Sequence, residues 1–330
     1  MLYPLVCRPL LVERLWGGRR LARLYGKPLP ADTLVGEAWE VADLPAGAST
    51  IANGPLEGRT LTHVSAELGA DLIGTAWPAG RFPLLVKLLD AADDLSVQVH
   101  PSADDCARWF PDARSKDESW VVVDAEPGAR VYYGFQPGTT HAAFEAHLAA
   151  GTLLDVLQPV AVQPGDVLRV APGTVHALGR GVAVLEVQEP SDTTYRLYDY
   201  GRGREVHVAQ GARVTRITTG AARLRPLARE AEWGAHELLV DVPAYRLERL
   251  TAEAVLAWRV DPRSAQVLTL LEGAALLRAD ETELRLNAGD TVILPARLGG
   301  VALTPLEALV GVLAGAGGGL LCDDEADGGR

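Results

Sequence analysis

The sequence predicts a mainly β protein built from two antiparallel barrel or sandwich units with a small helical part. Short strand-like runs follow one another from about residue 83 and are separated by turns rich in glycine and proline. Few stretches carry the apolar spacing of a helix. A turn–strand–proline layout near residue 165 returns near residue 289. Many short strands with such turns favour an antiparallel barrel or sandwich over alternating strands and helices.

The composition is that of a globular protein with one large domain or two of ordinary size. The chain has 330 residues, is 48% hydrophobic and 22% charged, and carries a net charge of −12. Such an acidic chain is not expected to bind nucleic acid or an anionic membrane surface, although a local cluster of Lys and Arg can still bind a small anion.

The cellular compartment is inferred from cysteines and from the absence of sorting signals. Three cysteines, far apart and odd in number, do not indicate a disulfide framework. Arg8 and Glu13 come too early for the core of a signal peptide, and no apolar run reaches the length of a membrane span. We therefore expect a cytoplasmic protein.

The first 82 residues are expected to combine turns, a short buried segment and helices. Residues 16–18, Trp-Gly-Gly, predict a tight turn that opens a short amphipathic helix. The segment 36–43 is short, and its Trp39 is expected to pack in the core. Residues 62–74 predict a helix capped by Thr62.

From residue 82 the hydrophobic period changes from 3.6 to 2, which indicates strands. A helical insert interrupts them at about 140–158. The segment GDTVILPA at 289–296 has the same layout as GDVLRVAP at 165–172, but only the earlier copy is followed by a histidine, His176. The second unit is therefore expected to lack the metal site proposed below.

These patterns predict three parts along the chain. An N-terminal catalytic unit covers 1–223 and includes the helical insert. A degenerate C-terminal unit covers 224–316. The remaining residues, 317–330, are rich in glycine and acidic residues and are expected to be disordered.

Four side chains are candidate metal ligands. Gln98 and His100 are separated by one residue in an apolar run, so they point to the same face of a strand. Glu118 precedes a predicted strand, and His176 follows a Gly-Pro turn. Each of them alone could be a hydrogen-bonded core residue, but the set is harder to explain in that way. Two imidazoles, a carboxylate and an amide oxygen suit a divalent ion such as zinc.

A second group consists of charged residues inside or beside apolar strands. Lys87, Glu186 and Arg196 each interrupt such a run, and buried charges need partners or a ligand. One explanation is that Glu186 and Arg196 pair across neighbouring strands. The other is an anion pocket, completed by Lys116 and Arg202, in which Arg and Lys would bind a phosphate.

Other catalytic signatures are absent. The sequence contains no GxSxG and no HExxH motif, and no Cys/His pairing of note. Glu37 and Glu40 are expected to be solvent-facing or structural carboxylates.

At these residues the chain resembles the type I mannose-6-phosphate isomerases, in particular their short bacterial form, which belong to the cupin superfamily. The matching stretches are LWGGRRL, GEAWEVAD, ANGPLEGRTL, FPLLVKLLDAADDLSVQVHP, SKDESW and GDVLRVAPGTVHALGRGVAVLEVQEPSDTTYRLYDYGR, which extend to about Arg202. The resemblance implies two cupin, jelly-roll-like β-barrel units. It also implies a zinc-dependent aldose–ketose isomerase that interconverts mannose 6-phosphate and fructose 6-phosphate through a cis-enediol.

The resemblance also implies a role for each site residue. One zinc ion per chain would be held by Gln98, His100, Glu118 and His176. Catalytic roles fall on Arg196, Glu186 and Lys116, and substrate or phosphate binding falls on Lys87, Ser96 and Arg202.

Glu186 is the first choice for the general base, with a zinc-bound water or Lys116 as alternatives, and Arg196 would stabilise the enediolate. The expected partner is a small phosphosugar, and the expected state is a monomer or homodimer.

Two other classes of function are considered. An iron-dependent cupin oxygenase would need an open, His-rich site, and Gln98 among the ligands argues against it. A non-catalytic sugar-binding or regulatory cupin would be expected to have lost a metal ligand or part of the Lys/Arg set, and none is lost. Because fold alone does not decide function, the preference for the isomerase rests on these site residues.

Overall fold

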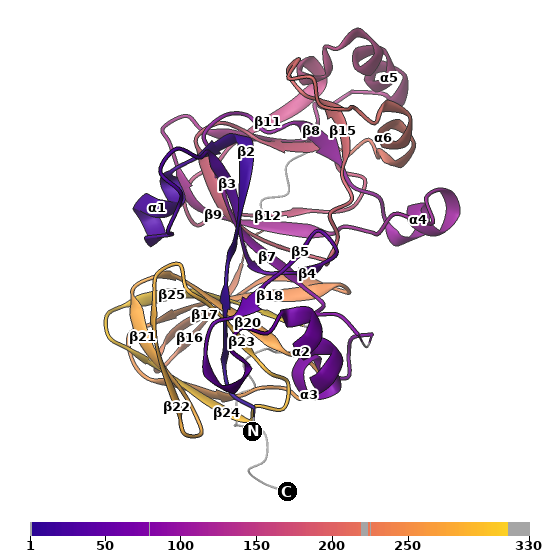
Figure 1. Cartoon of the computed structure of the whole chain (residues 1–330). Coiled ribbons are helices and arrows are strands. Elements are labelled where there is room, and N and C mark those ends of the chain that lie inside the picture. Colours follow the sequence, from indigo (N-terminus) through magenta and orange to yellow (C-terminus); the bar gives the residue numbers. More distant parts are fainter. Residues whose placement is uncertain (1, 79, 219–223, 225, 316–330) are drawn as a thin grey trace, which may run out of the picture.

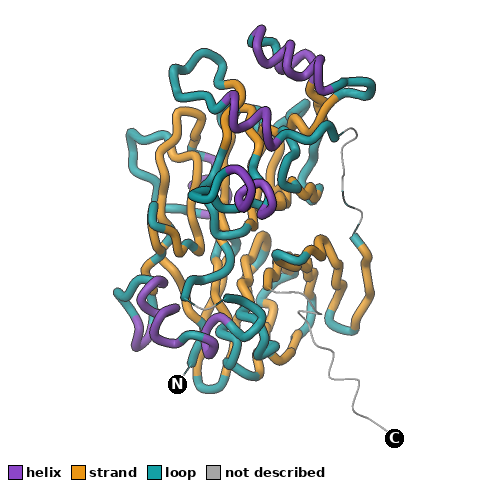
Figure 2. Tube along the Cα trace, turned by 90° about the vertical axis from the view of Figure 1, so that its right-hand side faces the viewer, coloured by secondary structure: helices purple, strands orange, loops and turns teal. Residues whose placement is uncertain are grey.

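The computed structural model describes residues 2–78, 80–218, 224 and 226–315. Most of its elements are strands, as expected, and they form two pairs of facing sheets, which lie one above the other in Figure 1 and are seen from the side in Figure 2. The predicted tail at 317–330 lies outside the described residues. None of the helices described is long and apolar enough to cross a bilayer.

The upper pair in Figure 1 consists of a six-stranded and a five-stranded antiparallel sheet. The six-stranded sheet has the order β12 (Val167–Val170), β9 (Glu118–Ala125), β14 (Val182–Gln188), β7 (Leu85–Ala91), β3 (Val35–Val41), β2 (Leu10–Gly18). The five-stranded sheet has the order β11 (Leu157–Ala161), β10 (Arg130–Phe135), β13 (His176–Leu178), β8 (Val97–Val99), β15 (Tyr195–Tyr198).

The lower pair consists of an eight-stranded and a four-stranded antiparallel sheet. The eight-stranded sheet has the order β16 (Leu227–Ala231), β17 (Gly234–Val242), β18 (Tyr245–Ala252), β25 (Leu309–Gly315), β20 (Gln266–Glu272), β23 (Thr291–Leu294), β1 (Leu5–Arg8), β6 (Thr50–Ile51). The four-stranded sheet has the order β19 (Leu256–Arg259), β24 (Gly300–Pro305), β21 (Ala274–Ala279), β22 (Thr282–Asn287). A separate ribbon pairs β4 (Asp43–Leu44) with β5 (Gly47–Ala48).

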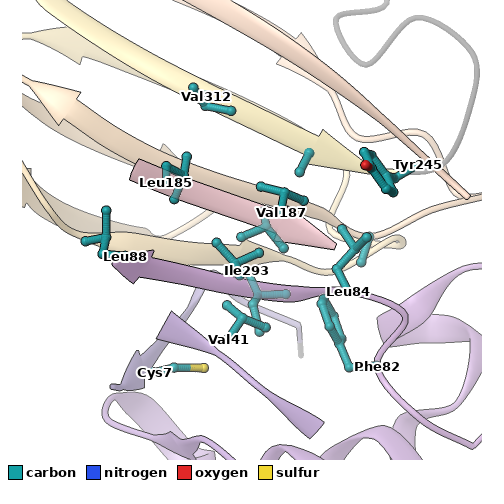
Figure 3. Packing of buried hydrophobic residues seen from close by; sticks show 14 of the residues in the cluster. Cys7, Val41, Phe82, Leu84, Leu88, Leu185, Val187, Tyr245, Ile293 and Val312 are labelled. Carbon is teal, nitrogen blue, oxygen red and sulfur yellow. The ribbon is translucent and has the colours of Figure 1, made fainter. Parts of the chain in front are cut away.

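The two sheet pairs share a hydrophobic core, which lies between the six-stranded and the eight-stranded sheet. Both of these sheets are therefore buried on both faces. Leu88 of β7 and Val312 of β25 belong to one buried cluster between these sheets, which Figure 3 shows. The next residues, Leu89 and Leu313, belong to the cores inside the upper and the lower pair. Strands buried on both faces read as continuous apolar runs, which explains the runs seen in the sequence.

Short helices cover the sheet edges and one outer face. The helices are α1 (Arg20–Tyr25), α2 (Leu61–Leu68), α3 (Ala70–Ile73), α4 (Ala103–Trp109), α5 (His141–Ala150), α6 (Val208–Val214), and the 3-10 turns η1 (Gly54–Leu56) and η2 (Leu153–Val156). Phe144 of α5 and Val214 of α6 pack with Val99 against the five-stranded sheet. The predicted insert at 140–158 is thus α5 and η2, followed by the start of β11.

Two local expectations were wrong. Residues 16–18 are not a turn but the end of β2. Glycine is needed there because a Cβ on Gly17 would lie 2.4 Å from the backbone nitrogen of Gly36 in the adjacent strand. The helix at 62–74 begins one residue earlier, after its cap Thr60, whose side chain accepts a hydrogen bond from His63 N, and it is divided at Gly69, which has a φ of +50°.

The chain crosses between the two sheet pairs at its beginning. Strand β1 pairs with β23, with Leu5 opposite Ile293, although it belongs in sequence to the predicted N-terminal unit. The division into units at residue 223 stays a prediction, while the hydrogen-bonded sheets assign β1 and β6 to the eight-stranded sheet.

Candidate metal centre and active-site cavity

A cavity of about 460 Å³ lies beside the facing sheets of the upper pair. Its walls carry side chains from both sheets, including Glu186 of the six-stranded sheet and Gln98 of the five-stranded sheet. Leu89 and Trp120, which also line it, belong to the core between these sheets. The cavity therefore replaces part of that core with charged and polar groups.

One wall is a row of side chains that crosses four strands of the six-stranded sheet. Glu186 is opposite Trp120 on β9 and opposite Lys87 on β7, and Lys87 is in turn opposite Trp39 on β3. All four line the cavity. Residues in register across a sheet share a face, so strand pairing alone brings these distant positions together.

A second row comes from the facing sheet. Gln98 of β8 is opposite His176 on β13 and opposite Arg196 on β15. His100 follows Gln98 by two residues and therefore points the same way. The two rows meet at Glu118, the first residue of β9, whose side chain reaches the imidazoles of the facing sheet.

His100, Glu118 and His176 form a compact cluster whose ligand atoms all lie within 4.8 Å of one another. His176 Nε2 is 3.2 Å from Glu118 Oε1, and His100 Nε2 is 3.5 Å from Glu118 Oε2. The Gln98 amide nitrogen is 3.2 Å from His176 Nε2, and half a turn of the amide presents its oxygen there instead. The structure thus brings together all four predicted ligands.

The two imidazoles are held by their other ring nitrogens. His100 Nδ1 lies 2.9 Å from the carbonyl oxygen of Thr193, and His176 Nδ1 lies 2.9 Å from that of Thr174. A carbonyl oxygen only accepts, so each Nδ1 carries the proton and each Nε2 turns a lone pair toward Glu118. Such backbone contacts are what fix ligand tautomers at metal sites.

The donor set fits a divalent metal ion. His100 Nε2 and Glu118 Oε1 are buried and have no hydrogen-bond partner among the described residues, and Glu118 Oε2 has the ammonium of Lys116 at 2.7 Å. Unpartnered buried acceptors are costly, and a cation would satisfy them. Two imidazole nitrogens, one carboxylate and one amide oxygen are ligands that zinc accepts.

Burial and the charges around the cluster favour the protonation states that metal ligands need, a neutral imidazole and an ionised carboxylate. Burial, with the nearby charge of Lys116, lowers the pKa of His100 to about 3, which keeps this imidazole neutral. Burial alone would lower the pKa of Lys116 and raise that of Glu118, but their mutual attraction at 2.7 Å outweighs both effects. The pKa of Lys116 is therefore raised, and that of Glu118 is held well below its usual range.

Lys87 and Glu186 form a buried ion pair in the cavity wall. Lys87 Nζ donates to Glu186 Oε1 at 3.0 Å, and the indole of Trp120 donates to Oε2 at 3.0 Å. Lys87 is also 3.8 Å from Glu37 and lies over the ring of Trp39. Glu186 therefore pairs with Lys87, and the explanation in which Glu186 pairs with Arg196 was wrong.

Three arginines gather along the cavity. Burial and the positive charges of Arg204 and Arg14 lower the pKa of Arg196, while Asp199 acts in the opposite direction. Arg196 itself donates to the Ser96 hydroxyl at 3.3 Å and to a backbone carbonyl at 2.7 Å, neither of which is an anion. An anion bound beside these guanidinium groups would relieve their repulsion.

Arg202, the predicted phosphate ligand, does not line this cavity. Its guanidinium donates to Asp93 Oδ2 at 2.5 Å and to the Asp94 carbonyl at 2.7 Å. Arg204, two residues further on, lines the cavity and pairs with Asp199. No pattern in the sequence distinguished these two arginines.

Sequence reasoning missed Glu37 as a cavity residue. Its carboxylate is buried and accepts hydrogen bonds of 2.6 Å from Arg14 Nε and from Trp39 Nε1. Glu40 is also buried and pairs with Lys27 at 2.8 Å, so neither carboxylate faces solvent. The one-residue spacing of Glu37 and Trp39 is the signal that could have placed both on one strand face, as it did for Gln98 and His100.

Comparison with known proteins identifies the family. The family model for the phosphomannose isomerase type I catalytic domain matches residues 4–122. A probable mannose-6-phosphate isomerase of Bacillus subtilis, GmuF, is 35% identical over 314 residues, which cover 91% of this chain and 95% of the relative. The mannose-6-phosphate isomerase of Streptococcus mutans is 32% identical over 302 residues, covering 89% and 93% of the two chains.

Solved structures agree with this assignment. The crystal structure of the mannose 6-phosphate isomerase from Bacillus subtilis superposes with a TM-score of 0.87 at 28% identity, over 94% of this chain and 99% of that one. A zinc-bound mannose 6-phosphate isomerase has the same fold, with a TM-score of 0.77 at 19% identity over 94% and 98% of the two chains. This chain belongs to the type I phosphomannose isomerase family.

Proposed function

We propose that this chain interconverts mannose 6-phosphate and fructose 6-phosphate with one zinc ion held by Gln98, His100, Glu118 and His176. The proposal rests on the convergence of these ligand atoms, of which those of His100, Glu118 and His176 are buried, beside a cavity lined by both basic and acidic side chains. Zinc at this position would act as a Lewis acid toward the oxygens of the reacting carbons.

The reaction moves one proton from C2 to C1 and a second from the C2 hydroxyl to the C1 oxygen, through a cis-enediol. We assign the proton transfer to Glu186, which would take the proton from C2 of mannose 6-phosphate and return it to C1. Its carboxylate lines the cavity and is held by the donors Lys87 and Trp120. Lys116 stays the alternative base, but its ammonium is paired with Glu118, and its raised pKa favours the protonated form.

We assign the anionic parts of the substrate to the arginines and to the neighbouring polar side chains. Arg14, Arg196 and Arg204 supply the positive charge that a phosphate monoester requires. Arg196, next to Gln98 in its row, is also suited to stabilise the enediolate. Ser96 and Lys87 complete the substrate contacts.

We further propose that the two sheet pairs are two cupin units, of which only the N-terminal one binds metal. The layout shared by 165–172 and 289–296 supports this. In each copy a glycine with a φ of +89° precedes a buried strand, β12 after Gly165 and β23 after Gly289. His176 supplies a ligand only after the first copy.

The test is isomerisation of mannose 6-phosphate by the purified protein as isolated, after chelation, and after zinc is returned. Loss and recovery of turnover, with one zinc per chain, would support the proposal. Zinc binding should also raise the melting temperature, and His100→Ala should abolish this rise. A zinc-loaded protein without turnover would contradict the isomerase function. Binding of mannose 6-phosphate to it would then favour the non-catalytic sugar-binding alternative.

A further inference from the structure

The lower sheet pair, most of whose strands come from the C-terminal part of the chain, supplies no side chain to the cavity wall. None of its described residues is among those that line the cavity, the last of which is Arg204. This sheet pair nevertheless packs directly behind the strand that carries Glu118. In β9, Trp120 lines the cavity and Glu118, two residues earlier, lies on the same face of the strand, so the alternating residues, Ser119 and Val121, face the opposite way. Val121 belongs to the core shared with the C-terminal sheets.

Tyr245, the first residue of β18, reaches this rear face of β9. Its side chain is fully buried, and its hydroxyl lies 3.0 Å from Asp117 Oδ1 and 2.8 Å from Ser119 Oγ. A carboxylate only accepts, so the tyrosine donates to Asp117, and its oxygen accepts from the Ser119 hydroxyl. Burial, with the charge of Asp117, raises the pKa of Tyr245 well above its usual value, so the hydroxyl keeps its proton.

These two bonds hold the residues on either side of Glu118. Asp117 is further fixed by Arg169 of β12, which donates from Nε at 3.1 Å and from Nη2 at 2.5 Å. Its backbone nitrogen donates to Glu189 at 2.9 Å. The main chain at Glu118 is therefore anchored from behind through the side chains of its neighbours.

The carboxylate of Glu118 has few contacts of its own that would orient it. Carboxylate ligands are normally held by hydrogen bonds from groups outside the metal site. Among the described residues outside the proposed ligand set, Glu118 has one such contact, the ammonium of Lys116 at 2.7 Å from Oε2, while Oε1 has no hydrogen-bond partner and lies beside the ligand imidazole of His176. Its position therefore depends on the Lys116 ion pair and on where the backbone of β9 is held.

We propose that Tyr245 is a positioning residue for Glu118, through which the C-terminal unit sets the geometry of the metal site. This inference rests on the proposed function, because it takes Glu118 as a zinc ligand. The hydroxyl does not touch substrate or metal. Its contribution is to keep Asp117 and Ser119, and with them the Glu118 backbone, in one place.

The test compares Tyr245→Phe with Tyr3→Phe. Both tyrosines are buried in the same cluster, and each hydroxyl makes two hydrogen bonds, but those of Tyr3 go to the Asn53 carbonyl and the Leu56 nitrogen, far along the chain from Glu118. Zinc affinity of the metal-free proteins is measured by competition with a chromophoric chelator, and unfolding is measured alongside. Tyr245→Phe is expected to weaken zinc binding about tenfold, as loss of an outer contact at a metal site does. Tyr3→Phe should leave zinc affinity unchanged.

A second variant keeps the inference testable if Tyr245→Phe folds poorly. Ser119→Ala removes one of the same two bonds from the opposite side and should weaken zinc binding in the same direction. The double variant should then lose less than the sum of the single losses, because the two changes remove a shared contact. With zinc saturating, turnover should fall in the Tyr245 variant while KM for mannose 6-phosphate is unchanged.

The outcomes separate the inference from the proposed function. If the wild-type protein binds zinc and isomerises the sugar, but Tyr245→Phe and Ser119→Ala bind zinc as tightly as Tyr3→Phe, the positioning role is overturned and the function stands. If the wild-type protein does not bind zinc, the proposed function fails first.

Discussion

Glu186 lies directly opposite Lys87 on the neighbouring strand, and its Oε1 accepts a 3.0 Å hydrogen bond from the lysine ammonium. The two indoles of Trp120 and Trp39 flank this pair in the same row. In a second buried pair, Lys27 Nζ lies 2.8 Å from a carboxylate oxygen of Glu40, and neither of these residues lines the cavity. Substitutions of Glu40 and Lys27 can therefore serve as controls for the same substitutions of Glu186 and Lys87.

Glu186→Gln is expected to lower kcat by about 10²- to 10⁴-fold, the usual contribution of a general base. Zinc content should stay at the wild-type level, because Glu186 is not among the proposed ligands. The measurement is steady-state isomerisation together with metal analysis. Glu40→Gln also removes a buried carboxylate charge beside a lysine, and its kcat should be close to wild type. Near-normal turnover of Glu186→Gln would remove Glu186 from the role of base and leave Lys116 as the residue to examine.

Lys87→Met should lower kcat/KM by about 10- to 100-fold, since a hydrogen bond to a charged group contributes roughly 1.5–3 kcal/mol. It should also destabilise the protein by about 3–5 kcal/mol, because Glu186 would be left as an unpaired buried charge. Lys27→Met should show a similar stability loss, measured by urea unfolding, without the kinetic effect. Equal kinetic losses in both variants would mean that Lys87 acts only through stability.

Glu37 should make stability depend on pH in the acidic range. Burial alone raises the pKa of Glu37, but the charges of Lys87 and Arg14 outweigh it, so the pKa in the folded protein lies below the ordinary value of 4.5. The stabilisation is then complete above about pH 4.5 and is lost as the pH falls through the lower, folded-state pKa.

Glu37→Gln should therefore be less stable than wild type at neutral pH, with a gap that narrows below about pH 4.5. Urea unfolding at several pH values from neutral to acidic measures this gap. Glu13→Gln, at an exposed position next to Arg14, serves as the control. A gap that stays constant or widens toward acid would contradict the assigned interaction.

The sequence was sufficient for the β class and for recognising that the four predicted ligands lie close together, because both depend largely on local rules. Gln98 and His100 share a strand face wherever that strand lies, and the turn before His176 is readable in the sequence. The pairing of Glu186 was not readable, since its partner is decided by the register between strands about 100 residues apart. The same holds for Glu37, whose environment comes from the strands of Arg14 and Lys87.

Local misreadings have equally physical causes. The Trp-Gly-Gly segment contains turn residues, but its glycines serve the close approach of two strands, which only the partner strand with Gly36 reveals. Curated relatives match about 90% of the chain, so the similarity continues beyond the motifs that end near Arg202. The matched region therefore extends into the last third of the chain, where no described residue lines the cavity.

The pairing of β1 with β23 has a consequence for synthesis on the ribosome. Leu5 and Ile293 are partners in one sheet, and Ile293 comes 288 positions after Leu5 in the chain. At about 5–20 residues per second, the first strand waits roughly 15–60 s for its neighbour to be made. Throughout that time its edge is available for pairing with other chains. We therefore expect that a chaperone has to cover this strand edge in the nascent chain until translation is nearly complete.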